Sequence, residues 1–566
     1  MLAALLLPCL LSAGTTHATA ASRKAATEPW LLAALEARLS RLTSDQLALS
    51  PDGEKLAYTF REGPDLFLLI AACSEPTKVL TQVRIGTEDS SQHIGRPLKI
   101  DDGRFMGRRL PQPIPYKGKT APVAHRLLWA GNRHLVVVTN LNVPTISAGL
   151  NYSNRHGGLF VVNADGTGGR LLTTSTDIHR RFDKGTFFTD LVLADETHGL
   201  VRLNAEEALQ IGLLDGKLKR VPLADHTRAS EAVRAEEKRR QQLALPHVRG
   251  LEREFPEDKI DLLGADQSVR LLALRKQSPI DAGSLCVLVP AGQKLLEVAR
   301  CQPETDPGQY LVERRRLVDD EGIEHESVQL RRKLPLPGRG GLIVVCGDKP
   351  TAPVPRAYDP RLMCLVEMGY TVLQAGDLQL PGKPSKAEQL REVLRLLPQE
   401  GLRDQRGRPL PPAPRALLGL GKEGNELAYL ALYHQEESWD AGIFLRPSIS
   451  STGLLGPYAE LLGPEWGERQ HPSTKTNRQA LCLYEDGTDT ARREKLLQWA
   501  MELFGPLEKN GTLVTYTPET WAARVLQHDE ELVPLYEEIG HFLHGALVRA
   551  RVELGKPEVV QEPAKE

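Results

Sequence analysis

The chain has 566 residues, of which 41% are hydrophobic and 25% are charged. This composition is typical of a folded soluble protein and excludes a mainly disordered or collagen-like chain. The 71 basic and 73 acidic side chains leave a formal net charge of -2, so no overall positive field attracts nucleic acid, and we expect no nucleic-acid partner.

The first twenty residues predict a signal peptide. A short apolar run begins at Leu2 and is followed by small polar residues and by Ala18-Thr19-Ala20, which has the small-x-small form that a signal peptidase cleaves. The run is too short to span a bilayer, and no later run is long enough. We therefore expect an exported protein, periplasmic or extracellular, without a membrane span. The alternative is an apolar N-terminus without a targeting role, because no Lys or Arg precedes the run.

Seven cysteines occur, none of them in a Cys-x-x-Cys pair or at zinc spacing. We accordingly expect no metal and no cofactor. Cys286 and Cys301 lie in neighbouring strand-like segments and could pair in an exported protein. Most of the other cysteines stand in apolar surroundings, which predicts buried thiols.

Residues 47 to 301 predict a series of short hairpins. Leu47 to Tyr58 contains a strand, a Pro-Asp-Gly turn and a second strand, and Asp and Gly supply the backbone angles that such a turn needs. Repeated hairpins predict a propeller or a sandwich, and we assign residues 45–305 to a degenerate β-propeller-like domain. At roughly 40–45 residues per blade, about five to seven blades would fit. Further strand pairs are expected at 127–139, 158–173, 191–203, 211–222 and within 261–289.

A dense charge run at residues 231–242 interrupts this series. It predicts a solvated helix inserted between blades.

From residue 306 onward, strands alternate with helices. A hairpin at 310–330 precedes a continuously apolar segment at 342–346, which is typical of a strand buried on both faces. Such alternation predicts a doubly wound, mostly parallel sheet. Further strands are expected at 370–374, 415–418, 441–445, 480–484 and 512–516, and helices at 361–368, 386–397, 425–433, 490–504 and 531–552.

Hairpins with Ser-Pro-Asp-Gly turns followed by such an α/β half resemble the prolyl oligopeptidase family of serine peptidases. The resemblance covers most of the chain after the leader. It implies an N-terminal β-propeller and a C-terminal α/β-hydrolase domain, here residues 306–556, together with serine-peptidase ancestry. Its landmarks are the segments 358–373, 416–428, 481–490 and 514–521.

The chemistry of that family needs a serine on a sharp strand-to-helix turn, a histidine base and an acid that orients the histidine. Mapped onto this sequence, the serine position falls on Gly421 and the histidine position on Trp521, while Asp489 can occupy the acid position. The loop after Cys346 stands where the family shapes its oxyanion site. Nucleophile and base are therefore both absent, and we expect no catalytic residues; Asp489 would then cap its loop or face solvent.

Two other readings remain open. An active peptidase or esterase could use displaced residues, although these side chains are more often loop caps or helix-surface groups. The displaced candidates are Ser448, Ser450 and Ser451 with His528, His541 or His544. Alternatively, Gly419-x-Gly421-x-x-Gly424 has the form of a dinucleotide fingerprint. Glu423 would repel a pyrophosphate, however, and Arg446 stands where an acidic residue is expected. Our first hypothesis is an exported, non-catalytic family member that binds a peptide or protein between its domains.

Overall fold

The computed structural model describes most of the chain between residues 28 and 554. The described residues are 28–39, 42–87 without 64, 104–105, 108–109, 123–140, 145–147, 150–152, 157–182, 188–302, 306–318, 324–336, 340–346, 357–375, 415–420, 439–445, 479–485, 512–519 and 533–554, with isolated helical residues within 424–432 and 497–505. Within these ranges no helix is long and apolar enough to cross a membrane.

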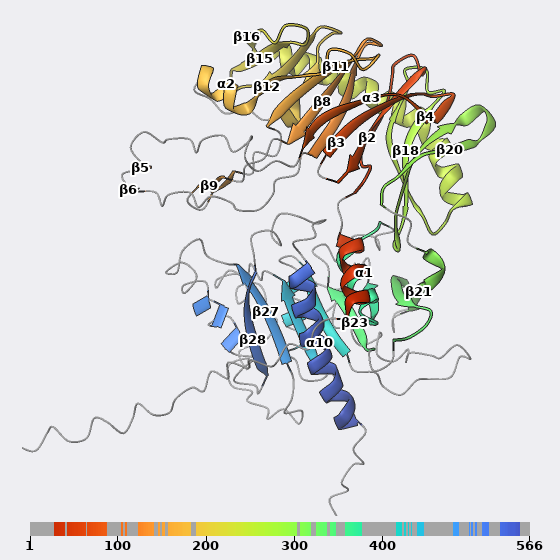
Figure 1. The fold of residues 1–566 in the computed structure, drawn as a ribbon, viewed down its shortest axis with the longest axis vertical. Helices are drawn as coiled ribbons and strands as arrows, with labels where there is room; N and C mark the ends of the chain where they lie inside the picture. The colour runs from red at the N-terminus through yellow and green to blue at the C-terminus, as the bar shows by residue number, and fades with distance from the viewer. Residues whose placement is uncertain are drawn as a thin grey trace, which may run out of the picture.

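Four antiparallel four-stranded sheets make up a first unit, called here the four-sheet unit (Figure 1). Each sheet is built from strands that follow one another along the chain, as the hairpin pattern predicts. The sheets are, in order, β1 (Leu47–Leu49) to β4 (Glu75–Thr87) with β2 (Lys55–Glu62) and β3 (Asp65–Ala72); β7 (Val123–Ala130), β8 (His134–Asn140), β11 (Gly158–Asn163) and β12 (Arg170–Thr174); β13 (Val192–Leu193), β14 (His198–Arg202), β15 (Glu207–Gly212) and β16 (Leu218–Pro222); and β17 (Lys259–Ala265), β18 (Leu272–Ser278), β19 (Asp281–Val289) and β20 (Lys294–Arg300).

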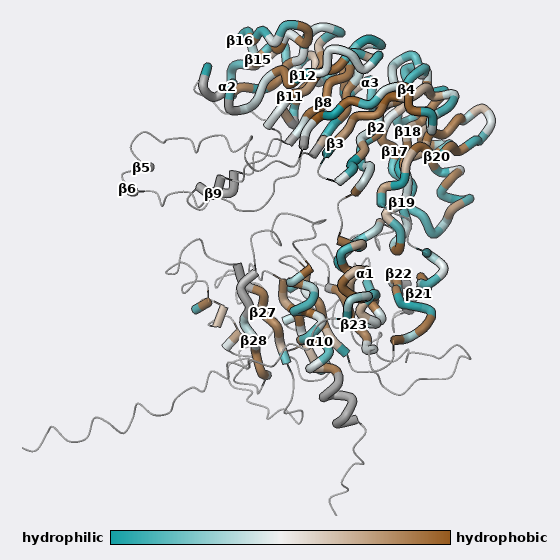
Figure 2. The backbone as a smooth tube through the Cα atoms, in the orientation of Figure 1, coloured by the Kyte–Doolittle hydropathy of each residue, from teal (hydrophilic) through white to brown (hydrophobic). Residues whose placement is uncertain are grey.

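The turn between β1 and β2 shows why these hairpins form. Gly53 has a φ of 73°, a left-handed conformation that glycine adopts without steric cost. The Asp52 carboxylate accepts hydrogen bonds from Ser50 Oγ at 2.6 Å and from the Glu54 backbone N–H at 3.0 Å. The predicted turn chemistry is therefore confirmed here. The hydropathy pattern in Figure 2 agrees, with apolar residues along the strands and polar residues at many turns.

Strand β1 contacts both β7 and β17, which are the first strands of their sheets, and the last strands β4 and β20 contact each other. The first sheet therefore lies beside both the second and the fourth. The described residues contain four such sheets, against the five to seven blades expected. Most of residues 88–122 and 141–156 lie outside the described residues; within them, β5 (Arg104–Phe105) pairs with β6 (Arg108–Arg109), and β9 (Thr145–Ser147) with β10 (Leu150–Tyr152).

The charged insertion is a helix, α3 (Leu223–Glu254), and is much longer than the predicted 231–242. Its first half contacts the third sheet, and its second half contacts β17. Ala244, Val248 and Leu251 are buried against the fourth sheet, because their spacing places them on one face of a helix. The expectation of a solvated helix thus holds only for part of α3, which also takes up chain length that would otherwise suffice for most of a blade.

The possible Cys286–Cys301 disulfide is not formed, because both thiols are free and buried. Cys286 packs with α3 on one face of the fourth sheet, and Cys301 packs in the core shared with the first sheet. Since the two side chains belong to different cores, a bond between them would require the sheet to rearrange.

A second unit is built on one eight-stranded sheet. Its strand order is β21-β22-β24-β23-β25-β26-β27-β28. The six strands from β23 to β28 run parallel, and the β21–β22 hairpin joins antiparallel at one edge, which confirms the predicted mostly parallel sheet. The strands are β21 (Tyr310–Val318), β22 (Glu324–Arg332), β23 (Leu342–Cys346), β24 (Thr371–Ala375), β25 (Arg415–Leu420), β26 (Ala441–Leu445), β27 (Gln479–Glu485) and β28 (Leu513–Glu519).

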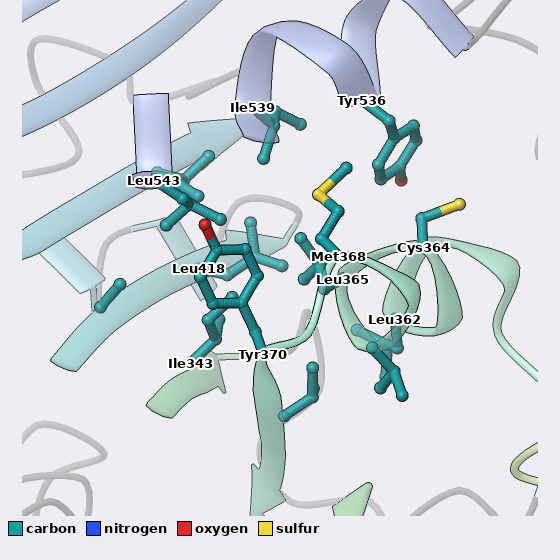
Figure 3. Close-up of a cluster of buried hydrophobic side chains, with 14 of the residues drawn as sticks. Ile343, Leu362, Cys364, Leu365, Met368, Tyr370, Leu418, Tyr536, Ile539 and Leu543 are labelled. Atoms are coloured by element: carbon teal, nitrogen blue, oxygen red, sulfur yellow. The ribbon is translucent and has the colours of Figure 1, made fainter. Parts of the chain in front are cut away.

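Helical segments cover both faces of this sheet. On one face pack α1 (Pro29–Leu39), α4 (Pro360–Glu367) and α10 (Val533–Leu554), and Figure 3 shows Tyr370, Leu418 and Leu543 within this core. On the other face, Tyr429 and Phe504 of the described helical residues within 424–432 and 497–505 contact Phe444 of β26. Helix α1 precedes the four-sheet unit in the chain yet packs on the second unit (Figure 1). The predicted helix at 386–397 lies outside the described residues. We call this assembly the eight-stranded unit.

Candidate functional site

The three strands that precede the triad-equivalent positions end at the same end of the parallel sheet. Leu420 at the end of β25 is level with Leu445 of β26, which is level with Leu483 of β27 and in turn with Thr517 of β28. With strands about 4.8 Å apart, the ends of β25 and β28 are about 14 Å from each other. The segments that follow β25, β27 and β28 therefore all leave the sheet at its carboxyl end.

The three predicted positions themselves lie outside the described residues. Gly421 directly follows β25, Asp489 comes four residues after β27, and Trp521 comes two residues after β28. Ser448, Ser450, Ser451 and His528 also lie outside the described residues. The structure thus places the strands that carry the candidate site and does not place the site residues.

The chain reverses sharply after β25. A Cβ added at Gly419 would lie 2.8 Å from the Cα of Asn425 and 2.7 Å from its Oδ1, closer than real Cβ contacts. Asn425 belongs to the helical segment that follows, so the chain returns against the strand that it has just left.

Asn425 fixes this reversal from a buried position. Its side chain is fully buried, and its Nδ2 donates a hydrogen bond to the carbonyl oxygen of Leu445 at 2.8 Å. The bond ties the start of the returning helix to the end of β26. The sequence predicts a helix that starts at Asn425, and an Asn at a helix start is the available signal. The contact with β26 has no signal in the sequence.

A cluster of aromatic rings packs against strands β26 and β28. Phe444 of β26 and Phe504 contact edge to face with ring centroids 4.9 Å apart, and Tyr429 and Tyr516 stand 5.7 Å and 6.4 Å from Phe504. These rings join two helical segments to β26 and β28. Such pairs add to the burial of apolar surface, so the strand ends are held by a packed core.

The described residues that could replace the missing groups are poorly suited to do so. Burial raises the pKa of the Cys482 thiol of β27, so this group stays protonated at neutral pH. The thiolate, and not the thiol, is the nucleophilic form. On α10, His544 is exposed and His541 is partly buried. This helix packs on the same face of the sheet as α1 and α4. In the described part of the chain, no group of three or more His, Cys, Asp or Glu residues is arranged to hold a metal ion.

The dinucleotide reading rests on residues that are only partly described. Gly419 and Gly424 are described, whereas 421–423 are not. The contact with Asn425 requires a glycine at position 419. This packing explains Gly419 without a bound dinucleotide.

No protein-family profile matches the sequence, and no curated protein matches it significantly. Similar solved structures are peptidases of the prolyl oligopeptidase family. The AtxE2 isopeptidase is 13% identical with a TM-score of 0.44, and the match covers 92% of this chain and 98% of that one. Oligopeptidase B from Leishmania major is 10% identical with a TM-score of 0.37, and puromycin hydrolase is 14% identical with a TM-score of 0.38.

The lengths covered differ between these structures. The match with oligopeptidase B covers 93% of this chain and 67% of that one, and the match with puromycin hydrolase covers 89% and 69%. A prolyl endopeptidase is 13% identical to this chain with a TM-score of 0.36, and the match covers only 66% of that protein's length. At these TM-scores the likeness is weak, so the function of this chain rests on its own residues.

Proposed function

We propose that this chain is a prolyl oligopeptidase-like protein that has lost triad catalysis and binds a peptide or protein ligand between its two domains. The observation that carries the proposal is the reversal at Gly419 and Asn425, combined with a glycine at position 421. A strand followed by a helix that returns against it is the arrangement in which a nucleophile elbow presents its serine, and the glycine at position 421 has no side chain that could serve.

The loss of chemistry follows from the residue types. Gly421 offers no hydroxyl, and Trp521 offers no group that accepts a proton at neutral pH. Removal of the serine or the histidine from a working triad lowers turnover by on the order of 10⁶, because the members act as a unit. A site that lacks both would retain binding surface without useful hydrolysis.

We extend the proposal to the domains and to location. Residues 45–305 form a degenerate β-propeller-like domain, which the gathering of β1, β7 and β17 supports. Residues 306–556 form an α/β-hydrolase domain, which the six parallel strands and the covered faces support. Residues 1–20 act as a signal peptide for export, with the small-x-small triplet as the supporting feature.

Hydrolysis and binding are measured on the same preparation. Peptide substrates of 6–12 residues, with and without internal proline, are incubated with the protein, and their products are followed by mass spectrometry. The same peptides are then tested for a rise in melting temperature. A ligand at 100 times its dissociation constant adds about 2.7 kcal/mol to stability, which is easily detected.

The proposal predicts stabilisation by a subset of the peptides and no cleavage of any. Cleavage that survives purification to constant specific activity would contradict it and favour displaced catalytic residues. Stabilisation by NAD or NADP and by no peptide would instead favour the dinucleotide reading. A Tm unchanged by every peptide would count against a peptide ligand.

A further inference from the structure

One buried arginine touches both units of the molecule. Arg38 lies near the end of α1 and is 1% exposed. Its Nε donates to Oε1 of Glu367, at the end of α4, with a distance of 2.8 Å. Its Nη1 donates to the carbonyl oxygen of Ile280 at 3.2 Å. Glu367 belongs to the eight-stranded unit and Ile280 to the four-sheet unit, so a single guanidinium bridges them.

The carboxylate of Glu367 has further donors inside its own unit. Tyr310 Oη donates to Oε1 at 2.6 Å, and Arg332 Nη1 donates to Oε2 at 2.6 Å. The Arg38 guanidinium also lies over the Tyr310 ring, 4.9 Å from its centroid. Glu367 would therefore remain paired with Arg332 if Arg38 were lost, whereas the contact of Arg38 with Ile280 would have no substitute from Arg332.

Ile280 stands at the tip of the β18–β19 hairpin, and the backbone beside the tip is closely packed. Gly283 has a φ of 80°, and a Cβ at that position would lie 1.7 Å from the carbonyl oxygen of Lys276. Asp281 accepts hydrogen bonds from the Gly283 backbone N–H at 2.9 Å and from Arg300 at 3.0 Å. The tip packs Ile280 against the core of the eight-stranded unit. The hairpin thus places the carbonyl group of Ile280 within hydrogen-bond distance of Arg38.

The covalent connections between the units pass the same place. The backbone N–H of Thr43, in the segment after α1, donates to the carbonyl oxygen of Cys301 at 2.7 Å. Gln302 Nε2 and Tyr358 Oη donate to the Arg38 carbonyl at 3.4 Å and 3.5 Å. Tyr358 also packs against the cores of both units. The side chain and the backbone of Arg38 are therefore both held at the junction.

We propose that Arg38 is an interdomain lock that fixes the two units in one orientation and makes them unfold together. The inference concerns how the units are joined and goes beyond the proposed ligand binding. Its physical basis is that a buried guanidinium is costly unless it is paired, and Arg38 reaches both Glu367 and the Ile280 carbonyl only when the units are docked. Buried polar groups of this kind specify one arrangement among several that apolar contacts alone would allow.

A second ion pair joins the units and provides a contrast. Arg314 Nε of β21 lies 2.7 Å from Oε2 of Glu257, whose side chain is 59% exposed. Ion pairs that face solvent contribute little, because water screens them. The lock is accordingly expected at Arg38 and not at Arg314.

The test compares Arg38→Met, Arg38→Lys, Arg332→Met and Arg314→Met in the full chain, by calorimetric unfolding and small-angle X-ray scattering. Wild type should show one transition. Arg38→Met should show two resolved transitions and a larger radius of gyration. Arg38→Lys keeps a charge near Glu367 and loses the fork that reaches Ile280, so it should also show two transitions, and it decides the matter if Arg38→Met does not fold.

Arg332→Met removes the other arginine from the same carboxylate and leaves the bridge in place. It should show one transition at lower temperature with an unchanged radius of gyration, and Arg314→Met should resemble wild type. A single transition and an unchanged radius in Arg38→Lys would overturn the proposal. Two transitions in Arg332→Met would also overturn it, because pairing of Glu367 and not the bridge to Ile280 would then hold the units together.

Discussion

Gly419 and Asn425 are in contact across the turn that follows the central strand β25, with no space for a Cβ between them. The contact shows that the chain doubles back within a few residues. Gly421 follows β25 directly in the sequence, and in the proposed function it stands at the position where a hydrolase has its nucleophile.

Replacement of Gly419 by alanine should destabilise the fold. The added Cβ would lie 2.7 Å from Asn425 Oδ1 and 2.8 Å from its Cα, and backbone cannot give way as cheaply as a flexible side chain. We expect a loss of about 1–3 kcal/mol in the free energy of unfolding, as for other overpacked sites. Urea unfolding followed by circular dichroism measures it.

The matched control is Gly545→Ala. Gly545 lies inside α10, and a Cβ there would meet nothing within 4 Å. Because alanine is the better helix former, this variant should gain about 0.5–1 kcal/mol. Equal effects of the two substitutions would contradict the tight turn at Gly419.

Removal of the Asn425 amide should loosen the same turn. Asn425→Ala removes the donor to the Leu445 carbonyl in a fully buried position. Leaving a buried polar group without its partner costs about 1–3 kcal/mol. Asn425→Asp retains the side-chain oxygen and lacks the donor, so it should lose stability at neutral pH as well. Hydrogen exchange at β26 should rise in both variants, and unchanged exchange there would show that the bond does not hold the strand end.

The described cysteines should resist alkylation in the folded protein. Burial raises the pKa of Cys73 and of Cys301 to about 12, so at pH 8 only about one molecule in ten thousand carries a thiolate at either position. Burial also raises the pKa of the remaining described thiols, Cys286, Cys364 and Cys482.

The sign of the pH dependence follows from these shifts. The reactive thiolates of Cys73 and Cys301 form only as pH rises toward 12, whereas an ordinary thiol ionises near pH 8.5. Iodoacetamide at pH 8, with peptide mapping by mass spectrometry, should label these five residues in urea and leave them unlabelled in buffer. Rapid labelling of Cys482 in buffer would reopen it as a displaced nucleophile.

Restoration of both missing groups should test whether the site has lost only its chemistry. A serine alone lacks its base, so Gly421→Ser should gain little, because triad members act as a unit. Gly421→Ser combined with Trp521→His should react with a fluorophosphonate at position 421. The control is Gly421→Ala with Trp521→His, which supplies the base without a nucleophile and should remain unlabelled.

Most of the strands and turns could be predicted from local patterns in the sequence. The Asp52-Gly53 turn and the apolar strand from Leu342 have short-range signatures that the structure confirms. Helix α1 was missed although Leu31, Leu35 and Leu39 recur at helical spacing, because its burial depends on helices more than 300 residues away in the chain. The leucine spacing indicates an amphipathic helix, and it does not indicate the distant surface on which that helix packs.

The candidate site was predictable only in part, for the same reason. The mostly parallel sheet was predicted, and its strand order brings the carboxyl ends of β25, β27 and β28 to the same end of the sheet. The contact between Gly419 and Asn425 required coordinates, since a glycine before a turn has many explanations in sequence alone. Asp489 and Trp521 lie beyond the ends of their strands and outside the described residues, so their assignment remains a prediction.

Labelling of the purified wild-type protein with a fluorophosphonate serine probe tests the proposed hydrolase scaffold without a nucleophile. An active serine hydrolase and a heat-denatured sample serve as controls. We predict no labelling of the wild type. Labelling that is lost on denaturation and maps to Ser448, Ser450 or Ser451 would contradict the claim and identify a displaced nucleophile.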